Sequence, residues 1–132
     1  MDYKALVKIA NDIKENAYVP YSGFNVGAAL LTKKGNVYTG VNVENASYSP
    51  TICAESTAIV KAVTEGEQDF CAIAVISNSD DFTMPCGVCR QRLFEFSEDL
   101  DVICANNELE YKVYKISDLL PYGFNKDSLT KG

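Results

Sequence analysis

Apolar and polar residues alternate along the chain with a period that changes from one segment to the next. Near the N-terminus, four apolar residues recur at helical spacing, and Lys and Glu residues fill the other face: Leu6, Ile9, Ala10 and Ile13. Side chains spaced in this way share one face of a helix. The pattern therefore predicts an amphipathic helix over residues 2–16.

Two β-like runs follow, 25–32 and 37–43, and the connection between them contains Gly35 and Asn36. A short connection of this composition is typical of a β-hairpin. After a loop over 44–50, Thr51 is a candidate N-cap for a second helix. The predicted inner face of that helix carries Ala54, Ala58, Ala62 and Val63.

The rest of the pattern predicts a strand over 71–77, a helix that follows Pro85 and runs to about Phe96, a strand over 100–105, an edge strand over 111–116 and a short helix over 117–120. The run 71–77 is almost wholly apolar, as expected for a strand that is buried on both faces. We therefore place it at the centre of the sheet. The order helix, hairpin, helix, strand, helix, strand implies an α/β fold in which a mixed sheet carries helices on both faces.

The length of 132 residues suffices for one compact domain with a sizeable core, so we interpret residues 1–132 as a single domain. With 47% hydrophobic and 23% charged residues, the composition indicates neither disorder nor a membrane span. The net charge is -6, and the Lys and Arg residues are scattered. Because binding to many phosphates needs a basic stripe, we expect a small-molecule substrate and no nucleic acid polymer.

The N-terminal residues mix charged and apolar side chains and show no export signal, so we expect a cytoplasmic location. The chain has five cysteines, an odd number. Outside an oxidising compartment these thiols should be reduced, which favours metal binding over disulfide bonds.

Three of the thiols belong to two motifs in a chain without histidine, Cys53-Ala54-Glu55 and Pro85-Cys86-Gly87-Val88-Cys89-Arg90. A thiolate cluster suits zinc, and three protein ligands leave the fourth tetrahedral position to a water. Glu55 stands two residues beyond a candidate ligand, where its carboxylate could move protons to and from that water. The motifs predict a catalytic zinc site that performs a hydrolysis.

Both motifs fall where a helix is predicted to begin. Cys86 and Cys89 are three residues apart, so their side chains point the same way. Cys53 stands at the start of the preceding helix. If the two helices begin side by side, the three sulfurs meet at two helix N-termini, whose partial positive charge favours thiolates.

The plain alternative is that the cysteines only fill space, since free cysteine is among the most buried residue types. The Cys-x-Glu triplet at a helix start and the Pro-Cys-Gly lead-in argue against it for the motif cysteines. Cys71 and Cys104 lie inside apolar strand runs, and for them we expect core packing. A closed structural zinc site with Cys104 as the fourth ligand is a rival interpretation.

On these motifs the chain resembles the cytidine deaminases of the small, homotetrameric, three-cysteine type, and the resemblance runs nearly from end to end. It implies a three-layer α/β/α fold with a mixed central sheet of about five strands. It also implies one zinc ion per subunit, held by Cys53, Cys86 and Cys89, with Glu55 as the catalytic proton shuttle. A homotetramer with active sites at the subunit interfaces follows from the same resemblance.

Two further segments look like the family's nucleoside-binding segments, Phe24-Asn25-Val26-Gly27-Ala28 and Asn42-Val43-Glu44-Asn45. The resemblance implies that Phe24 lies against the pyrimidine and that Asn42 and Glu44 bind the ribose hydroxyls. Asn42 and Glu44 are two residues apart at a strand end and so share a face, which suits a clamp for a diol. Taken alone, the pair would more often be a solvated strand edge, and Phe24 a core residue.

The resemblance also places Ala54, Tyr48 and Phe124 near the substrate, with Phe124 contributed by a neighbouring subunit. By themselves, Tyr48 and Phe124 could equally be interface or core aromatic residues.

One residue departs from the family pattern. Family members with three cysteine ligands commonly carry Arg directly after the triplet, whereas this chain has Ser56. Three thiolates on Zn²⁺ leave a net charge of about -1, and excess negative charge disfavours ionisation of the bound water. We hypothesise that Arg90 or Arg92 compensates by hydrogen-bonding a sulfur.

We therefore expect zinc-dependent hydrolytic deamination of cytidine and deoxycytidine to uridine or deoxyuridine and ammonia, in pyrimidine salvage. A deaminase of another aminopyrimidine, such as blasticidin S, is the rival among enzymes. The negative net charge disfavours a polynucleotide substrate, because the sequence shows no cluster of basic residues that could form a groove for the phosphates. The rival from a different class is a non-catalytic structural zinc module that binds a protein partner.

Overall fold

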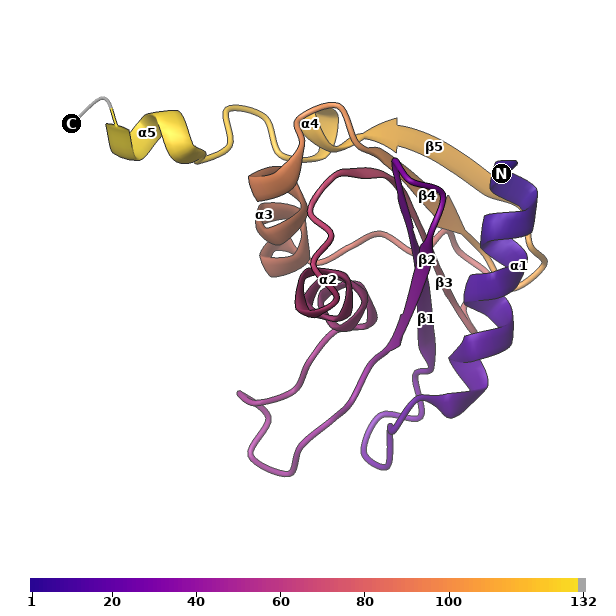
Figure 1. The fold of residues 1–132 in the computed structure, drawn as a ribbon. Helices are drawn as coiled ribbons and strands as arrows, with labels where there is room; N and C mark the ends of the chain where they lie inside the picture. Colours follow the sequence, from indigo (N-terminus) through magenta and orange to yellow (C-terminus); the bar gives the residue numbers. More distant parts are fainter. Residues whose placement is uncertain (131–132) are drawn as a thin grey trace.

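The computed structural model describes residues 1–130, which form a central sheet with helices on each face (Figure 1). Five strands pair in the order β2-β1-β3-β4-β5. They are β1 (Val26–Thr32), β2 (Val37–Val41), β3 (Phe70–Ser77), β4 (Asp101–Ala105) and β5 (Tyr111–Lys115). Strands β3 and β4 run parallel, and the other neighbours run antiparallel. The mixed five-stranded sheet and the central position of β3 confirm the sequence predictions.

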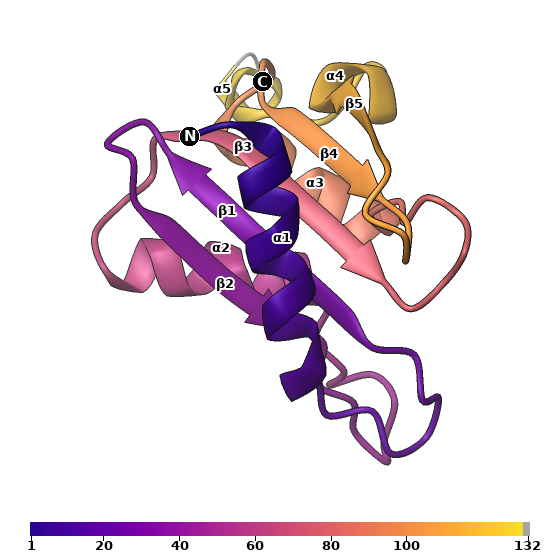
Figure 2. The ribbon, with the colours of Figure 1, turned by 90° about the vertical axis from the view of Figure 1, so that its right-hand side faces the viewer.

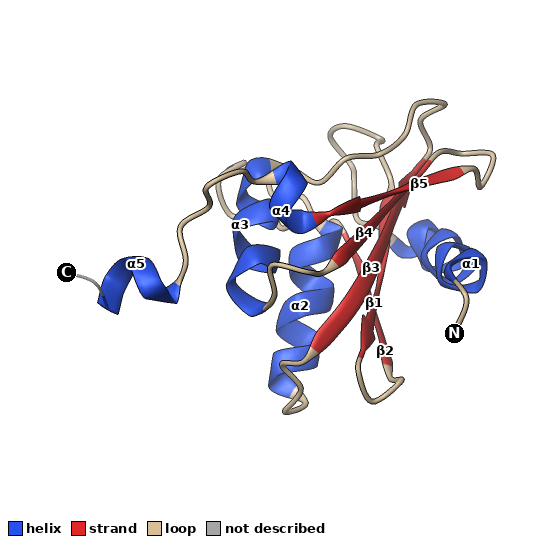
Figure 3. Ribbon diagram, turned by 90° about the horizontal axis from the view of Figure 1, so that it is seen from above, coloured by secondary structure: helices blue, strands red, loops and turns tan. Residues whose placement is uncertain are grey.

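The helices are α1 (Tyr3–Ile13), α2 (Ala54–Thr64), α3 (Gly87–Phe96), α4 (Ile116–Leu119) and α5 (Lys126–Thr130), and a 3-10 turn, η1 (Lys14–Asn16), extends α1. Figure 2 shows α1 in front of the sheet, and Figure 3 shows α2, α3 and α4 on the opposite face. The predicted helices on both faces are thus confirmed, whereas the pattern did not predict α5. None of the described helices combines the length and the apolar character needed to cross a membrane.

Each face of the sheet has its own apolar core. Because successive side chains of a strand point to opposite faces, β1 and β3 contribute to both cores. The core under α1 includes Leu6, Val7, Ala29, Leu31 and Ile76. The core under α2 and α3 includes Leu30, Ile73, Leu93, Val102 and Cys104, while Cys71 packs against the core under α1. Core packing of Cys71 and Cys104 is therefore confirmed.

Two glycines let the helices approach the strands closely. A Cβ on Gly40 of β2 would lie 2.3 Å from the carbonyl oxygen of Ala54 and 2.6 Å from the backbone nitrogen of Ala58, both in α2. A Cβ on Gly27 of β1 would lie 2.1 Å from the carbonyl oxygen of Ala10 in α1. Gly40 therefore sets how closely the first turn of α2 lies on the sheet.

The predicted start and inner face of the second helix were partly wrong. Helix α2 begins at Ala54 with Cys53 as its N-cap, while Thr51 lies in the loop and accepts a hydrogen bond from the backbone N–H of Asn45. The buried stripe of α2 contains Ala54, Ala58 and Ala62, as predicted. Val63 is 38% exposed, since it stands about 100° around the helix from Ala62.

Candidate metal centre and active site

Three thiols meet where α2 and α3 begin. Cys53 is the N-cap of α2, Cys86 is the N-cap of α3, and Cys89 lies in the first turn of α3. Their Sγ atoms all lie within 4.8 Å of one another, and the sulfurs of Cys53 and Cys86 are 3.5 Å apart. The predicted meeting of the three sulfurs at two helix N-termini is confirmed.

The donor set and its spacing fit zinc. A tetrahedral zinc about 2.3 Å from each sulfur holds the sulfurs about 3.8 Å apart, close to the spacing found here. The N-termini of both helices direct partial positive charge at the cluster. Cys86 is exposed and Cys53 is partly exposed, so the cluster has an open side for a ligand that is not part of the chain. The cluster is able to bind the zinc ion.

The thiols of the cluster also need a cation close by if all three are to be deprotonated. Cys53, followed by burial and the neighbouring Glu55, raises the pKa of the Cys89 thiol. Three thiolates held this close repel one another, so a divalent cation is needed for all of them to be deprotonated together.

Cys104 is not a member of this cluster. It is fully buried on β4 in the core under α2 and α3, and burial raises the pKa of its thiol to about 12. Among the described residues, the thiol cluster consists of the three motif cysteines. The rival four-cysteine structural site is therefore contradicted, and the fourth position is left to a ligand from outside the chain.

Glu55 lies beside the thiols in the first turn of α2, where only 4% of it is exposed. Burial raises the pKa of Glu55, and the opposing interactions with its own backbone N–H and with Cys89 are smaller. A carboxyl whose pKa is raised in this way accepts and returns a proton near neutral pH more readily than an exposed one. The position and the pKa shift both suit a general acid–base.

A cavity of about 220 Å³ opens in front of the thiols. It brings together six residues that the sequence had singled out: Phe24, Asn42, Cys53, Ala54, Glu55 and Cys86. The rest of its wall is Val26, which belongs to the predicted nucleoside-binding segment, and Thr51, Ile52, Thr83 and Met84, which the sequence analysis missed as site residues. For Thr83 and Met84, the available signal was their position directly before the Pro85 motif.

Asn42 follows the end of β2 at Val41, and both of its polar ends contact backbone. Its Oδ1 accepts a hydrogen bond from the N–H of Val26 at 3.0 Å, and its Nδ2 donates to the carbonyl of Phe24 at 2.8 Å. These bonds attach the Phe24 segment to the end of β2. One amide hydrogen and one oxygen lone pair are left for a ligand.

Glu44 lines an adjoining hollow of about 290 Å³ with Tyr21, Ser22, Asn45, Tyr48 and Thr51. Its carboxylate accepts hydrogen bonds from the N–H groups of Tyr21 and Ser22 at 3.1 Å each, and from the Ser22 hydroxyl. The Ser22 hydroxyl, and then the two N–H groups, outweigh burial and lower the pKa of Glu44. Because Thr51 lines both hollows, the hollow that Glu44 lines adjoins the thiol cavity.

Tyr48 and Phe124 lie outside the thiol cavity of their own chain. Tyr48 is 76% exposed in a loop, with a positive φ of 61°. Phe124 is 55% exposed in the segment between α4 and α5, where its carbonyl accepts a hydrogen bond of 2.7 Å from Gln91. In Figure 1 the chain runs from this segment into α5, which extends away from the layers.

The expected hydrogen bond from Arg90 or Arg92 to a sulfur is not formed. Arg90 donates to the backbone carbonyls of Pro85 and Leu119, at 2.8 and 2.9 Å. Arg92 donates from Nη1 to the hydroxyl of Ser56 at 2.6 Å. The hypothesis of direct contact was wrong because Ser56 stands between Arg92 and the cluster.

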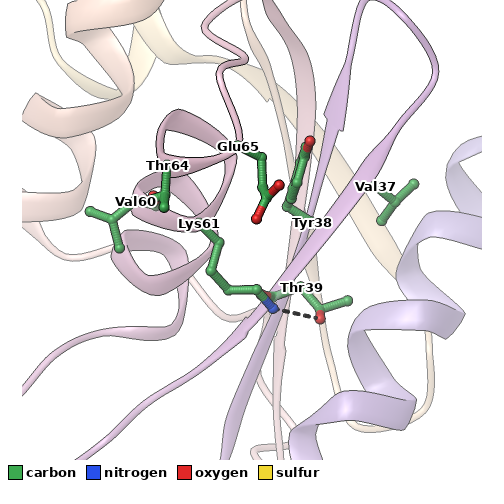
Figure 4. A pocket seen from close by; sticks show the side chains of 7 residues that line it. All are labelled: Val37, Tyr38, Thr39, Val60, Lys61, Thr64 and Glu65. Atoms are coloured by element: carbon green, nitrogen blue, oxygen red, sulfur yellow. Dashed lines mark hydrogen bonds between the residues drawn. The ribbon is translucent and has the colours of Figure 1, made fainter.

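A hollow of about 470 Å³ between β2 and α2 offers no comparable chemistry (Figure 4). It is lined by Val37, Tyr38, Thr39, Val60, Lys61, Thr64 and Glu65. Lys61 donates from Nζ to the carbonyl and the hydroxyl of Thr39, at 2.6 and 3.3 Å. The ammonium of Lys61 is engaged in these bonds, and no thiol lines this hollow. The smaller cavity in front of the thiols is therefore the better candidate for the active site.

Comparison with known proteins agrees with this geometry. Residues 1–105 match the family model described as cytidine and deoxycytidylate deaminase zinc-binding region. The chain belongs to this deaminase family. Family membership confirms the predicted fold and identifies the chain as a zinc-dependent deaminase.

Several members of the deaminase family resemble the chain over most of its length. The cytidine deaminase of Halalkalibacterium halodurans is 45% identical over 130 residues, which are 98% of each chain. The crystal structure of cytidine deaminase from Burkholderia pseudomallei is 43% identical with a TM-score of 0.91, covering 94% of this chain and 100% of that chain. A blasticidin-S deaminase of Bacillus cereus is 32% identical over 113 residues, covering 78% of this chain and 79% of the relative.

Proposed function

We propose that the chain catalyses the zinc-dependent hydrolytic deamination of cytidine and deoxycytidine to uridine or deoxyuridine and ammonia. The observation that carries the proposal is the buried carboxyl of Glu55 in one cavity with the thiols of Cys53 and Cys86. Together with Cys89, these thiols are the proposed zinc ligands. Zinc, when bound, supplies an activated water for attack at C4 of the pyrimidine ring. The relatives named as cytidine deaminases support the choice of substrate.

Glu55 is the proposed catalytic residue and acts by moving protons. Its carboxylate takes a proton from the attacking water and delivers it to ring N3. It then takes the remaining proton from the new hydroxyl on C4 and gives it to the amine, so that the C4–N bond breaks, C4 becomes a carbonyl and ammonia leaves. Its position in the same cavity as the thiols supports this role, because each of these transfers needs the carboxyl within reach of the reacting atoms.

The remaining cavity residues are proposed to bind the nucleoside. Phe24 and Ala54 would contact the base from the cavity wall, and the free hydrogen-bonding positions of Asn42 would meet the ribose. The adjoining hollow supports a role for Glu44, because an ionised carboxylate accepts hydrogen bonds from sugar hydroxyls. Tyr48, which lines that hollow, would close its outer side.

We further propose a homotetramer in which Phe124 of one subunit completes the cavity of another. The exposure of Phe124, and of Tyr122 and Leu129 near it, supports this arrangement, since apolar side chains grouped on a surface often mark an interface. Light scattering after size exclusion measures the mass directly, and a monomer would contradict the arrangement. The proposal also includes a single domain over residues 1–132, a cytoplasmic location and a role in pyrimidine salvage.

A substrate panel tests the proposed function. The zinc-loaded protein is incubated with cytidine, deoxycytidine, cytosine, blasticidin S and a single-stranded oligonucleotide, and ammonia release is followed. We expect turnover of both nucleosides, weak turnover of cytosine because it lacks the sugar, and none of the oligonucleotide. Turnover of blasticidin S alone would replace the proposed substrate, an alternative that the Bacillus cereus relative supports. Release of no ammonia from any compound would refute the proposal.

A further inference from the structure

The thiol cluster places an unusual amount of negative charge in a small space. Three thiolates on Zn²⁺ sum to about -1, and Glu55 adds a further charge whenever it is ionised. The cation nearest in sequence to Cys89 is Arg90, but its hydrogen bonds go to backbone carbonyls. A compensating charge has to come from another side chain.

A continuous chain of hydrogen bonds leads from Arg92 to the cluster. Arg92 on α3 donates from Nη1 to the Ser56 hydroxyl on α2 at 2.6 Å, and that hydroxyl oxygen lies 3.2 Å from the sulfur of Cys89. Ser56 is 1% exposed and Cys89 is fully buried, so water does not screen the contact between them. Arg92 itself stands in the groove between α2 and α3 and is open to solvent.

The direction of these bonds follows from the donors available. A guanidinium has no acceptor, so the Ser56 oxygen accepts from Arg92. A hydroxyl carries a single hydrogen, and among the described residues the Cys89 sulfur is the partner left to accept it. If a Cys89 thiol donated to Ser56 instead, the buried hydroxyl hydrogen of Ser56 would have no acceptor among the described residues. The arrangement therefore suits a metal-bound thiolate, which can only accept.

We propose that Arg92 and Ser56 form a positioning pair that stabilises zinc at Cys89. Arg92 polarises and orients the Ser56 hydroxyl, and the hydroxyl donates to the thiolate and offsets part of its charge. The inference rests on the proposed function only in that Cys53, Cys86 and Cys89 are the zinc ligands. It is independent of which compound is deaminated.

Zinc affinity tests the pair without reference to activity. Competition with a chromogenic chelator is measured for the wild type, Ser56→Ala, Arg92→Gln and the double variant. Groups that hydrogen-bond metal ligands are worth about 10–100-fold in metal affinity, so we expect each single variant to bind zinc at least about 10-fold more weakly. Because the two residues act in series, the double variant should be no weaker than Ser56→Ala. Lys61→Gln removes a cation from the last turn of α2, at the opposite end of the helix from Cys53, as the matched control and should leave affinity unchanged.

Two further measurements separate the pair from a merely structural effect. In cobalt-substituted protein, the sulfur-to-cobalt charge-transfer band should shift in Ser56→Ala and Arg92→Gln and stay in place in Lys61→Gln. Arg92→Lys keeps a cationic donor and should recover part of the affinity. Unchanged zinc affinity in Arg92→Gln, or losses that add in the double variant, would overturn the proposal. A failed substrate panel with these affinity losses intact would refute the proposed function and leave the pair standing.

Discussion

Replacing Glu55 with glutamine should abolish turnover while leaving the zinc site intact. The substitution preserves the size of the side chain and removes its ability to carry a proton. Glu55 is 4% exposed, so bulk water has little access to take over its role. A positioned general acid–base contributes about 10²–10⁴-fold to a rate, or about 3–5 kcal/mol of barrier. Because Glu55 is proposed to carry both protons of the reaction, we expect kcat to fall by about 10⁴-fold.

The thermal stability of Glu55→Gln should rise or stay the same, although its activity falls. Burial raises the pKa of Glu55, which means that its charged form is disfavoured in the folded protein. A neutral amide of the same shape does not carry that penalty, so the thermal midpoint of Glu55→Gln should equal or exceed that of the wild type.

The assay combines zinc content, kcat and KM for cytidine, and thermal unfolding. Glu65→Gln makes the same chemical change at the opposite end of α2 and should leave all of these quantities near their wild-type values. Full zinc occupancy with more than about a tenth of wild-type kcat would refute the proton-transfer role, given the size of that effect elsewhere. Loss of zinc from Glu55→Gln would instead show that the carboxyl helps to hold the metal.

Three further predictions concern the scaffold around the site. Gly40→Ala forces a Cβ to 2.3 Å from the carbonyl of Ala54, so urea unfolding should show a loss of about 1–3 kcal/mol; an unchanged free energy of unfolding would contradict the close contact. Cys104→Ala should keep one zinc per chain by metal analysis, because its sulfur lies outside the cluster, and loss of the zinc would revive the structural-site interpretation. Burial raises the pKa of Asp101, but hydrogen bonds from Lys115 and Tyr3 outweigh burial and hold the pKa below its ordinary value. A carboxyl whose pKa is lower in the folded state stabilises the fold at pH values above its unfolded-state pKa, and this stabilisation is lost as the pH falls through the folded-state pKa. The wild type should therefore have a larger free energy of unfolding than Asp101→Asn at pH 6, and the difference between them should shrink toward pH 2. A gap that stays constant over this range would contradict the assignment.

The metal motif was predictable because its geometry is local. Cys86 and Cys89 are an N-cap and a first-turn residue of one helix, and a spacing of three residues brings them to one face wherever the helix lies. The uninterrupted apolar run of β3 likewise indicated a strand buried on both faces before any partner strand was known. Patterns of this kind depend on neighbours within a few residues, which the sequence displays directly.

The nucleoside segments show where local pattern was not enough. Asn42 and Glu44 were predicted to share a face at a strand end, but β2 ends at Val41 and the two side chains line adjoining hollows. Ser22, which orients the Glu44 carboxylate, lies 22 residues away from it. Loops take their shape from such distant contacts, and no periodic pattern reports them.

By itself, the sequence determined the order of the elements, the layered fold, the three thiols and the neighbouring carboxyl. Only the tertiary structure decided which side chains lie close enough to offset the negative charge of the thiol cluster. Arg92 and Ser56 are 36 residues apart and come together because α2 and α3 pack on the same face of the sheet. Spacing along a helix or strand sets which side chains share a face, whereas packing between elements sets which faces meet. The Ser56 hydroxyl comes to lie between Arg92 and Cys89 through packing between α2 and α3, which is why the predicted direct contact was wrong.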